Sequence, residues 1–206
     1  MPVVVVANPK GGVGKSTLAT NIAGYWAHRG HAVMLGDIDV QQSSRLWLQL
    51  RPPAARPITC WEVSSDFLAQ PPRGTTHVVL DTPAGLEGIR LRRVTRLADR
   101  VLVPLAPGIF DIYATRRFVD ELAALQRTRD FRIGLVAMRV DDRTLAAKQL
   151  ERFMQTLDAP VVGWLRSTQN YVQLAARGLT LFDVAPGRVL RDLEQWHELC
   201  RWLDRD

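Results

Sequence analysis

Residues 8–17 read Asn-Pro-Lys-Gly-Gly-Val-Gly-Lys-Ser-Thr and directly follow the apolar run 3–7. Three glycines in this stretch let the backbone turn tightly, so that successive N–H groups can point at phosphate oxygens. A helical pattern begins at Ser16, and the N-terminus of a helix attracts anions. In such a motif the Lys15 ammonium binds the β- and γ-phosphates and the Ser16 hydroxyl binds Mg²⁺. The stretch therefore predicts a phosphate-binding loop between a strand and a helix.

The rest of the chain alternates short, β-branched apolar runs with helical patterns, which favours a parallel sheet with crossover helices. We predict an α/β fold: a single-domain P-loop NTPase over residues 1–206, with a mostly parallel twisted sheet and helices on both faces. In such sheets ligands bind at the carboxyl ends of the strands, where all the motifs described here fall. Strands are expected at 3–7, 32–36, 58–63, 77–81, 101–106, 132–138 and 161–165. Helices are expected at 16–29, 41–50, 86–98, 113–127, 144–157, 169–177 and 188–203.

The phosphate loop departs from the general pattern in one respect. Pro9 stands where that pattern has a glycine, and Lys10 adds a second lysine. This arrangement resembles the deviant Walker A loop of the ParA/MinD family of ATPases, which includes plasmid and chromosome partition ATPases. The resemblance implies that Lys10 reaches across a nucleotide-sandwich homodimer to the partner's ATP; the alternative is a solvated loop charge. The nucleotide-binding residues that it implies are Lys10, Gly11, Gly12, Val13, Gly14, Lys15, Ser16 and Thr17.

Two carboxylates follow the second expected strand. Asp37 and Asp39 point the same way because side chains alternate along a strand. They resemble the D-x-D-P-Q motif of the family, which implies that Asp39 activates the attacking water and that Asp37 contributes to the Mg²⁺ site. With Lys10 and Lys15, Asp39 is an expected catalytic residue. Val40 replaces the usual proline, and the alternative for either carboxylate is a cap on the next helix.

The fourth expected strand is an apolar run that ends in Asp81, which is typical of a Walker B strand. Asp81 is expected to hold a water molecule bound to Mg²⁺, and Pro83 and Gly85 are expected to shape the switch loop that follows. The expected metal-site residues are thus Ser16, Asp37 and Asp81, and the expected cofactors are ATP and Mg²⁺. Further along, segment 104–111 resembles a family segment near the nucleotide base and the dimer interface. Pro107 is therefore an expected nucleotide contact, with a plain loop as the alternative.

The overall charge points to acidic partners. The chain carries a formal net charge of +6 and its isoelectric point is about 10, so nucleic acid or anionic lipid is plausible. Only three of its basic residues are lysines, and arginine suits phosphate contact because its planar fork binds two oxygens. Dimers of ParA-type ATPases bind DNA without sequence preference, and a solvated surface is the alternative for each arginine. The expected DNA contacts are Arg166, Arg177, Arg188, Arg191 and Arg201.

The resemblance covers the whole chain in motif order, and it is greatest to small ParF-like partition ATPases. With the phosphate loop at residue 10, we expect no N-terminal helix-turn-helix domain. We expect a cytoplasmic positioning ATPase, associated with the nucleoid in its ATP state, whose hydrolysis is stimulated by a ParB-like or other cargo-adaptor protein.

Two other functions are weighed against this one. A metabolic P-loop enzyme would use ATP to activate a small substrate, but no substrate motif stands out. A MinD-like regulator would cycle on a membrane, but the polar face of the last expected helix mixes acidic and basic residues. Membrane binding is therefore not expected.

Overall fold

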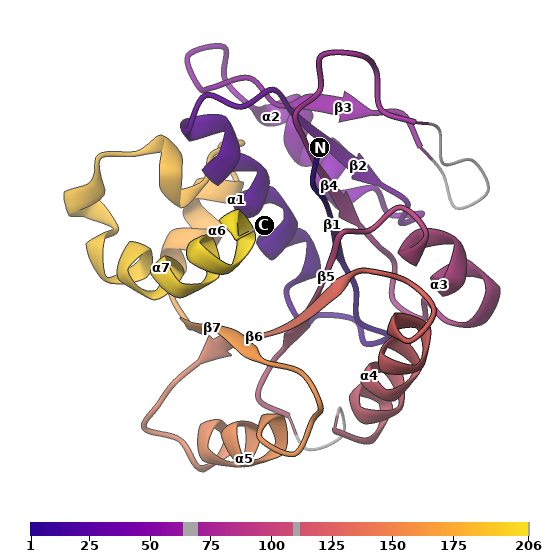
Figure 1. The fold of residues 1–206 in the computed structure, drawn as a ribbon. Coiled ribbons are helices and arrows are strands. Elements are labelled where there is room, and N and C mark those ends of the chain that lie inside the picture. The colour runs from indigo at the N-terminus through magenta and orange to yellow at the C-terminus, as the bar shows by residue number, and fades with distance from the viewer. Residues whose placement is uncertain (64–69, 109–111, 206) are drawn as a thin grey trace.

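The computed structural model describes residues 1–63, 70–108 and 112–205, apart from the side chains of residues 112 and 113. Its centre is a parallel sheet of seven strands in the order β3-β2-β4-β1-β5-β6-β7 (Figure 1). The strands are β1 (Val3–Val6), β2 (Val33–Asp37), β3 (Thr59–Trp61), β4 (His77–Asp81), β5 (Arg100–Leu105), β6 (Arg132–Val140) and β7 (Val161–Arg166). The predicted α/β class and parallel sheet are confirmed.

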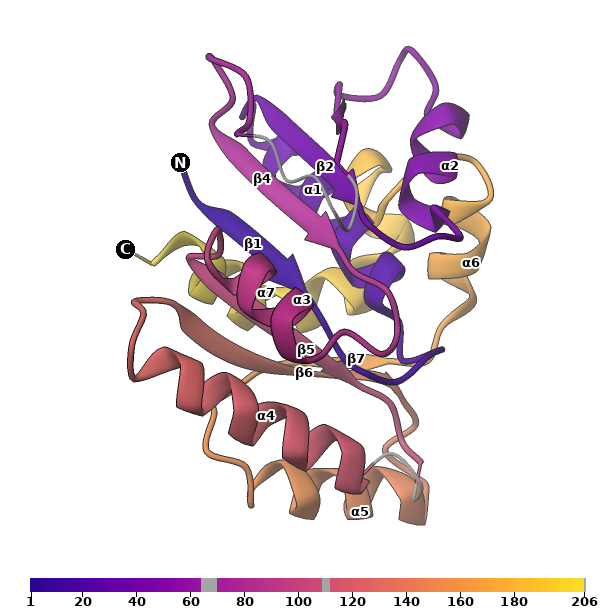
Figure 2. The same cartoon turned by 90° about the vertical axis from the view of Figure 1, so that its right-hand side faces the viewer.

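Helices cover both faces of this sheet, as Figures 1 and 2 show from two directions. One face is covered by α3, α4 and α5, and the other by α1, α6 and α7, with α2 beside α1. None of the helices in the described part of the chain is long and apolar enough to cross a membrane. The helices are α1 (Lys15–His28), α2 (Ser43–Leu50), α3 (Gly88–Thr95), α4 (Ile112–Gln126), α5 (Leu145–Met154), α6 (Gln169–Ala175) and α7 (Leu190–Asp204).

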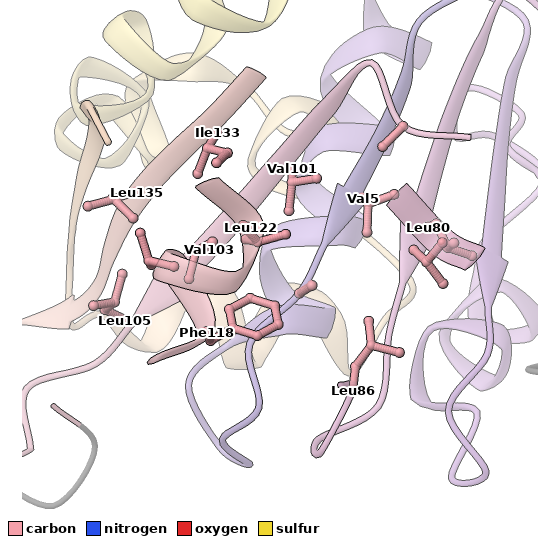
Figure 3. Packing of buried hydrophobic residues seen from close by; sticks show 14 of the residues in the cluster. Val5, Leu80, Leu86, Val101, Val103, Leu105, Phe118, Leu122, Ile133 and Leu135 are labelled. Atoms are coloured by element: carbon pink, nitrogen blue, oxygen red, sulfur yellow. The ribbon is translucent and has the colours of Figure 1, made fainter. Parts of the chain in front are cut away.

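The alternation of side chains along β1 divides the core into two layers. Val5 points to the face of α3 and α4, where it lies in a cluster with Phe118 and Leu122 (Figure 3). Val4 points to the opposite face, into a cluster with Leu18 and other residues of α1 and α7. A strand that is buried on both faces must be apolar at every position, and the four valines of β1 meet that demand.

Local turn chemistry explains where the predicted helices were too long. The helix expected from residue 41 begins at Ser43, because Gln42 adopts a left-handed φ of 49°. The helix expected to reach residue 177 ends at Ala175, shortly before Gly178, whose φ is 65°. The last helix begins at Leu190, after the 3₁₀ turn Pro186–Arg188.

A buried ion pair fastens the end of α2 to the segment that follows α6. The Arg51 guanidinium donates to both carboxylate oxygens of Asp183, at 2.9 and 2.7 Å, and to the Gly178 carbonyl at 3.1 Å. The two side chains are only 6% and 4% exposed. Asp183 Oδ2 also accepts hydrogen bonds from the backbone N–H and the hydroxyl of Thr180, so that both carboxylate oxygens have partners.

Candidate functional site

The phosphate loop joins β1 to α1 at the carboxyl edge of the sheet. Gly12 and Gly14 have φ values of 74° and 96°, which only glycine adopts without strain. A Cβ atom on Gly14 would also lie 3.0 Å from the Met138 side chain. Val13 is buried beneath the loop, whereas Gly11 and Gly12 are exposed. The loop therefore has the conformation that the glycine pattern predicts.

Asn8 fixes the start of the loop, and the sequence analysis gave it no role. Its side-chain amide donates to the Pro104 carbonyl on β5 at 2.8 Å, and its side-chain oxygen accepts from the Lys10 N–H at 2.8 Å. On the other side, the Gly85 N–H donates to the Pro9 carbonyl at 2.8 Å. These contacts tie the loop to β5 and to the switch loop after β4.

Lys15 is buried at the first turn of α1, with 8% of the residue exposed. Its ammonium donates to the carbonyl oxygen of Lys10 at 2.8 Å. Burial lowers the pKa of Lys15, while the carboxylates of Asp81 and Asp39 act to raise it. The net effect is a lowered pKa, so burial outweighs the two carboxylates, at the position where phosphate oxygens are predicted to bind.

Asp81 ends β4 in register with Val6 of β1 and Asp37 of β2. Its Oδ2 accepts a hydrogen bond of 2.7 Å from the Ser44 hydroxyl. Its Oδ1 is buried and has no hydrogen-bond partner within the described ranges. Burial raises the pKa of Asp81 to about 6, against the lowering effect of the nearby hydroxyls of Ser16 and Ser44. A buried carboxylate oxygen of this kind, beside the hydroxyl of Ser16, fits a Mg²⁺ site because Mg²⁺ prefers oxygen ligands and retains water.

Asp37 uses both oxygens to bind backbone N–H groups. Oδ1 accepts from Asp39 at 2.9 Å, and Oδ2 accepts from Ser44 at 2.8 Å and Arg45 at 3.3 Å. Burial raises the pKa of Asp37, and these N–H groups lower it. The side chain therefore caps the N-terminus of α2, which is the alternative weighed for it above. A contact of Asp37 with the metal site stays a prediction.

Asp39 lies at the mouth of the site and is half-exposed. Its Oδ1 accepts from the Gln41 N–H at 2.9 Å, which forms a tight turn just after β2. The intervening Val40, which replaces the usual proline, is 97% exposed. Activation of water by Asp39 stays a prediction, and the position of the side chain is compatible with it.

Most of the predicted site residues line one cavity of about 850 Å³. Asp39 and Val40, after β2, line it together with Lys15 and Thr17, which follow β1. Two arginines that the sequence analysis did not assign to it, Arg90 and Arg139, also line it. The lining residues are Gly11, Gly12, Gly14, Lys15, Ser16, Thr17, Ile38, Asp39, Val40, Gln41, Ser43, Pro83, Ala84, Arg90 and Arg139.

A second cavity of about 460 Å³ adjoins the first, because Thr17 and Arg139 line both. Its far wall comes from the end of β7 and the start of α6, including Arg166, Thr168 and Tyr171. Pro107 is described by the structure and lines neither of these two cavities. Its contact with the nucleotide stays a prediction, and residues 109–111 of the same segment lie outside the described residues.

Arg139 reaches both cavities because of an irregularity in β6. Its φ is 55°, in the left-handed region that residues other than glycine seldom adopt. The pairing of β6 with β7 shifts register between Ala137 and Val140, which is where this residue protrudes. No local sequence signal marks such a bulge, since an arginine in a strand is unremarkable by itself.

The five arginines predicted to contact DNA have different surroundings. Arg166 is partly buried and its guanidinium donates to Asp192 at 2.5 Å, so DNA contact by this residue stays a prediction with a competing role. The others are exposed and lie between the end of α6 and the last turns of α7. These four are Arg177, Arg188, Arg191 and Arg201. Figure 1 shows α6 and α7 on the face of the sheet opposite α4.

Replacing Asp81 with asparagine is expected to stabilise the nucleotide-free protein at pH 7.5. The pKa of Asp81 is raised from 3.8 to about 6 on folding. The folded state therefore holds this proton more tightly, and stability falls as the pH rises from about 4 to about 6. Asparagine removes a cost of the order of 2–3 kcal/mol at neutral pH. The free energy of unfolding is measured with urea at pH 4.5 and 7.5, and Asp158→Asn, at an exposed position, is the control. If the free energy of unfolding changes equally between the two pH values in wild type and in Asp81→Asn, the expectation is contradicted.

Comparison with known proteins places these features in context. The chain matches the family described as CobQ/CobB/MinD/ParA nucleotide binding domain over residues 4–181. It is 31% identical over 210 residues to maintenance of carboxysome distribution protein A of Gloeobacter kilaueensis, with 99% of this chain and 94% of that protein covered. It is 27% identical over 224 residues to the chromosome-partitioning ATPase Soj of Thermus thermophilus, covering 89% and 88%. The MinD cell division protein of Aquifex aeolicus has the same fold, with a TM-score of 0.74 at 18% identity over 98% of this chain and 96% of that one.

Proposed function

Because the chain belongs to the CobQ/CobB/MinD/ParA family of nucleotide-binding domains and is an ATPase with ATP and Mg²⁺ as cofactors, we propose that it is a ParA-type positioning factor. In this proposal ATP and Mg²⁺ bind each copy, and two copies form a nucleotide-sandwich dimer that holds DNA without sequence preference. A cargo-adaptor protein then stimulates hydrolysis and releases the DNA. Relatives that are named for carboxysome distribution and chromosome partitioning support a positioning role.

The residues of the first cavity have separate roles in this scheme. The ammonium of Lys15 leaves the Lys10 carbonyl and binds the terminal phosphates, a contact that its burial strengthens. The Ser16 hydroxyl and the unpaired Oδ1 of Asp81 hold Mg²⁺, directly or through water. When bound, Mg²⁺ neutralises charge on the phosphate oxygens. Asp39 orients the attacking water from the mouth of the cavity.

The observation that supports the dimer is the exposure of two aliphatic side chains, one in the lining of the first cavity and one next to a lining residue. Val40 lines the cavity yet is 97% exposed, and Ile89, next to the lining residue Arg90, is 81% exposed. A partner surface that covered both side chains would remove this apolar area from water, which favours association. A second copy placed mouth to mouth would cover both and bring its Lys10 to the ATP of the first.

The second cavity is the proposed site of the adenine base and ribose. A nucleotide whose phosphates bind at Lys15 and Ser16 can extend past Thr17, which lines both cavities. The volume of about 460 Å³ leaves room for a purine nucleoside.

The proposed DNA surface consists of the exposed arginines between α6 and α7. Dimerisation doubles this surface, and two weak patches that are joined bind far better than one. Each phosphate contact adds about −0.9 to the slope of log K against log salt. The exposed side of α7 also carries Glu194 and Glu198, which disfavours binding to anionic lipid. We accordingly place the protein in the cytoplasm, on the nucleoid when ATP is bound.

The test is binding to random-sequence duplex DNA in the presence of ATP or ADP. We expect ATP alone to promote salt-sensitive binding, and Lys10→Ala to lose it while still binding ATP. The double variant Arg188→Ala/Arg191→Ala is expected to bind DNA more weakly, with the salt slope reduced by about two units per copy. Arg73→Ala, an exposed arginine on another loop, is the matched control.

Two outcomes would redirect the proposal. If ATP is hydrolysed but DNA never binds, the protein belongs with family members that activate a small substrate or act at a membrane. Co-sedimentation with anionic liposomes separates these two. Equal effects of Arg73→Ala and the double variant would remove the α6–α7 arginines from the DNA surface.

A further inference from the structure

The far wall of the second cavity is held by hydrogen bonds to side chains of α7. Arg166, at the end of β7, donates from its backbone N–H to the Gln195 side-chain oxygen at 2.9 Å and from its guanidinium to Asp192 at 2.5 Å. Asn170, in the first turn of α6, donates its side-chain amide to the other oxygen of Asp192 at 2.5 Å. One carboxylate on α7 thus holds two successive segments of the cavity wall.

A further contact from α7 supports the same wall. The indole N–H of Trp196 donates to the Tyr171 hydroxyl at 2.9 Å. Trp196 is 1% exposed, and its ring packs edge-on against Phe182, with the ring centroids 5.4 Å apart. The anchor is therefore rigid, and Tyr171, which lines the cavity, is held by it.

Asp192 is the central residue of this arrangement. It is fully buried, at 0% exposure, and does not line either cavity. A buried carboxylate is tolerated only where charged or polar donors satisfy it. Because its two donors belong to β7 and α6, losing the carboxylate would release both segments at once, and the cavity between them would lose its shape.

We propose that Asp192 is a positioning residue that sets how tightly the nucleoside part of the nucleotide is held. It acts through Arg166 and Asn170 and makes no contact with the phosphate loop. This inference rests on the proposed function, which puts the base and ribose in the second cavity. It gives the buried acidic residue of α7 a role in nucleotide recognition in addition to its role in packing.

The test compares two ligands that share the phosphate loop and differ in the nucleoside. Dissociation constants for ATP and for inorganic tripolyphosphate, both with Mg²⁺, are measured by calorimetry. We expect Asp192→Asn to weaken ATP binding about tenfold, the effect of losing about 1.4 kcal/mol of contacts, and to leave tripolyphosphate binding unchanged. Asn170→Ala removes a hydrogen-bond donor to Asp192 that does not itself line the cavity. It is also expected to raise the ratio of the dissociation constant for ATP to that for tripolyphosphate.

The matched control is Asp183→Asn, which also removes a buried carboxylate paired with an arginine. It is expected to lower the melting temperature without changing the ratio of the two constants. If Asp192→Asn weakens the binding of ATP and tripolyphosphate equally, or weakens neither, the positioning role is overturned. Wild-type protein that binds ATP no better than tripolyphosphate would overturn the base site itself, so the two failures can be told apart.

Discussion

Replacing Lys15 with alanine is expected to reduce ATP hydrolysis by about 10²- to 10³-fold, the effect of removing one charge-stabilising donor from a buried site. Lys15 is 8% exposed and lies near Asp81 and Asp39. Without its ammonium, the terminal phosphates would approach the carboxylates of Asp81 and Asp39 without the buried cation that lies beside them. Steady-state hydrolysis and ATP binding by calorimetry both measure the effect. Affinity should fall with the rate, because the same charge is used in the ground state and in the transition state.

Two other lysines make this prediction specific. Lys148→Ala changes an exposed lysine on α5 and should leave both quantities unchanged. Lys10→Ala should retain ATP affinity in the single chain and lose only the steps that need a dimer. If Lys10→Ala and Lys15→Ala lose ATP affinity equally, Lys10 acts within its own chain and the proposed sandwich arrangement is wrong.

The largest expected effect on stability follows from Arg51→Met. This change leaves Asp183 buried at 4% exposure without its cation, which typically costs about 3–5 kcal/mol. Urea unfolding measures the loss. Arg45→Met, which breaks the exposed pair with Glu62, should cost less than about 1 kcal/mol. The double change Arg51→Met/Asp183→Leu should recover much of the loss, because it leaves no unpaired buried charge.

The same pair predicts a dependence on pH. Burial alone would raise the pKa of Asp183, but hydrogen bonds from Arg51 and Thr180 lower it below its usual value of 3.8. A lowered pKa contributes stability above the unfolded value, and this contribution is lost as the pH falls through the folded value. Wild type should therefore lose stability below about pH 4 more steeply than Arg51→Met. Parallel curves for the two proteins would show that the pair is not the source.

The phosphate loop could be predicted from the sequence because its residues are consecutive in the chain. Glycines, lysine and serine at fixed spacing determine the loop wherever it occurs, and a strand before it and a helix after it complete the pattern. The α/β class was equally accessible, since strands that are buried on both faces must be apolar throughout. The seven-stranded parallel sheet confirms the α/β class, and the family model confirms the predicted family.

The role of Asp37 could not be predicted from the neighbouring residues in the sequence. Its oxygens bind the N–H groups of Ser44 and Arg45, a contact that depends on how α2 approaches the sheet. An aspartate at the end of a strand can serve either as a metal ligand or as a cap for the next helix, so the sequence alone does not distinguish the two roles. Arg139 and Asp192 were missed for a related reason. The exposure of Arg139 at the cavities depends on a β-bulge, and the role of Asp192 depends on its pairing with Arg166, 26 residues earlier in the chain.

The strand order also has a consequence for synthesis of the chain on the ribosome. β1 lies at the middle of the sheet, where it pairs with β4 and β5, which end at Asp81 and Leu105. The side-chain amide of Asn8 likewise donates to a carbonyl on β5, that of Pro104. The phosphate loop is therefore completed only after β4 and β5 have been synthesised, because the strand before it, which ends at Val6, lies between strands that end at Asp81 and Leu105. Until then the valine-rich strand has two open edges, which makes the nascent chain a natural client for chaperones.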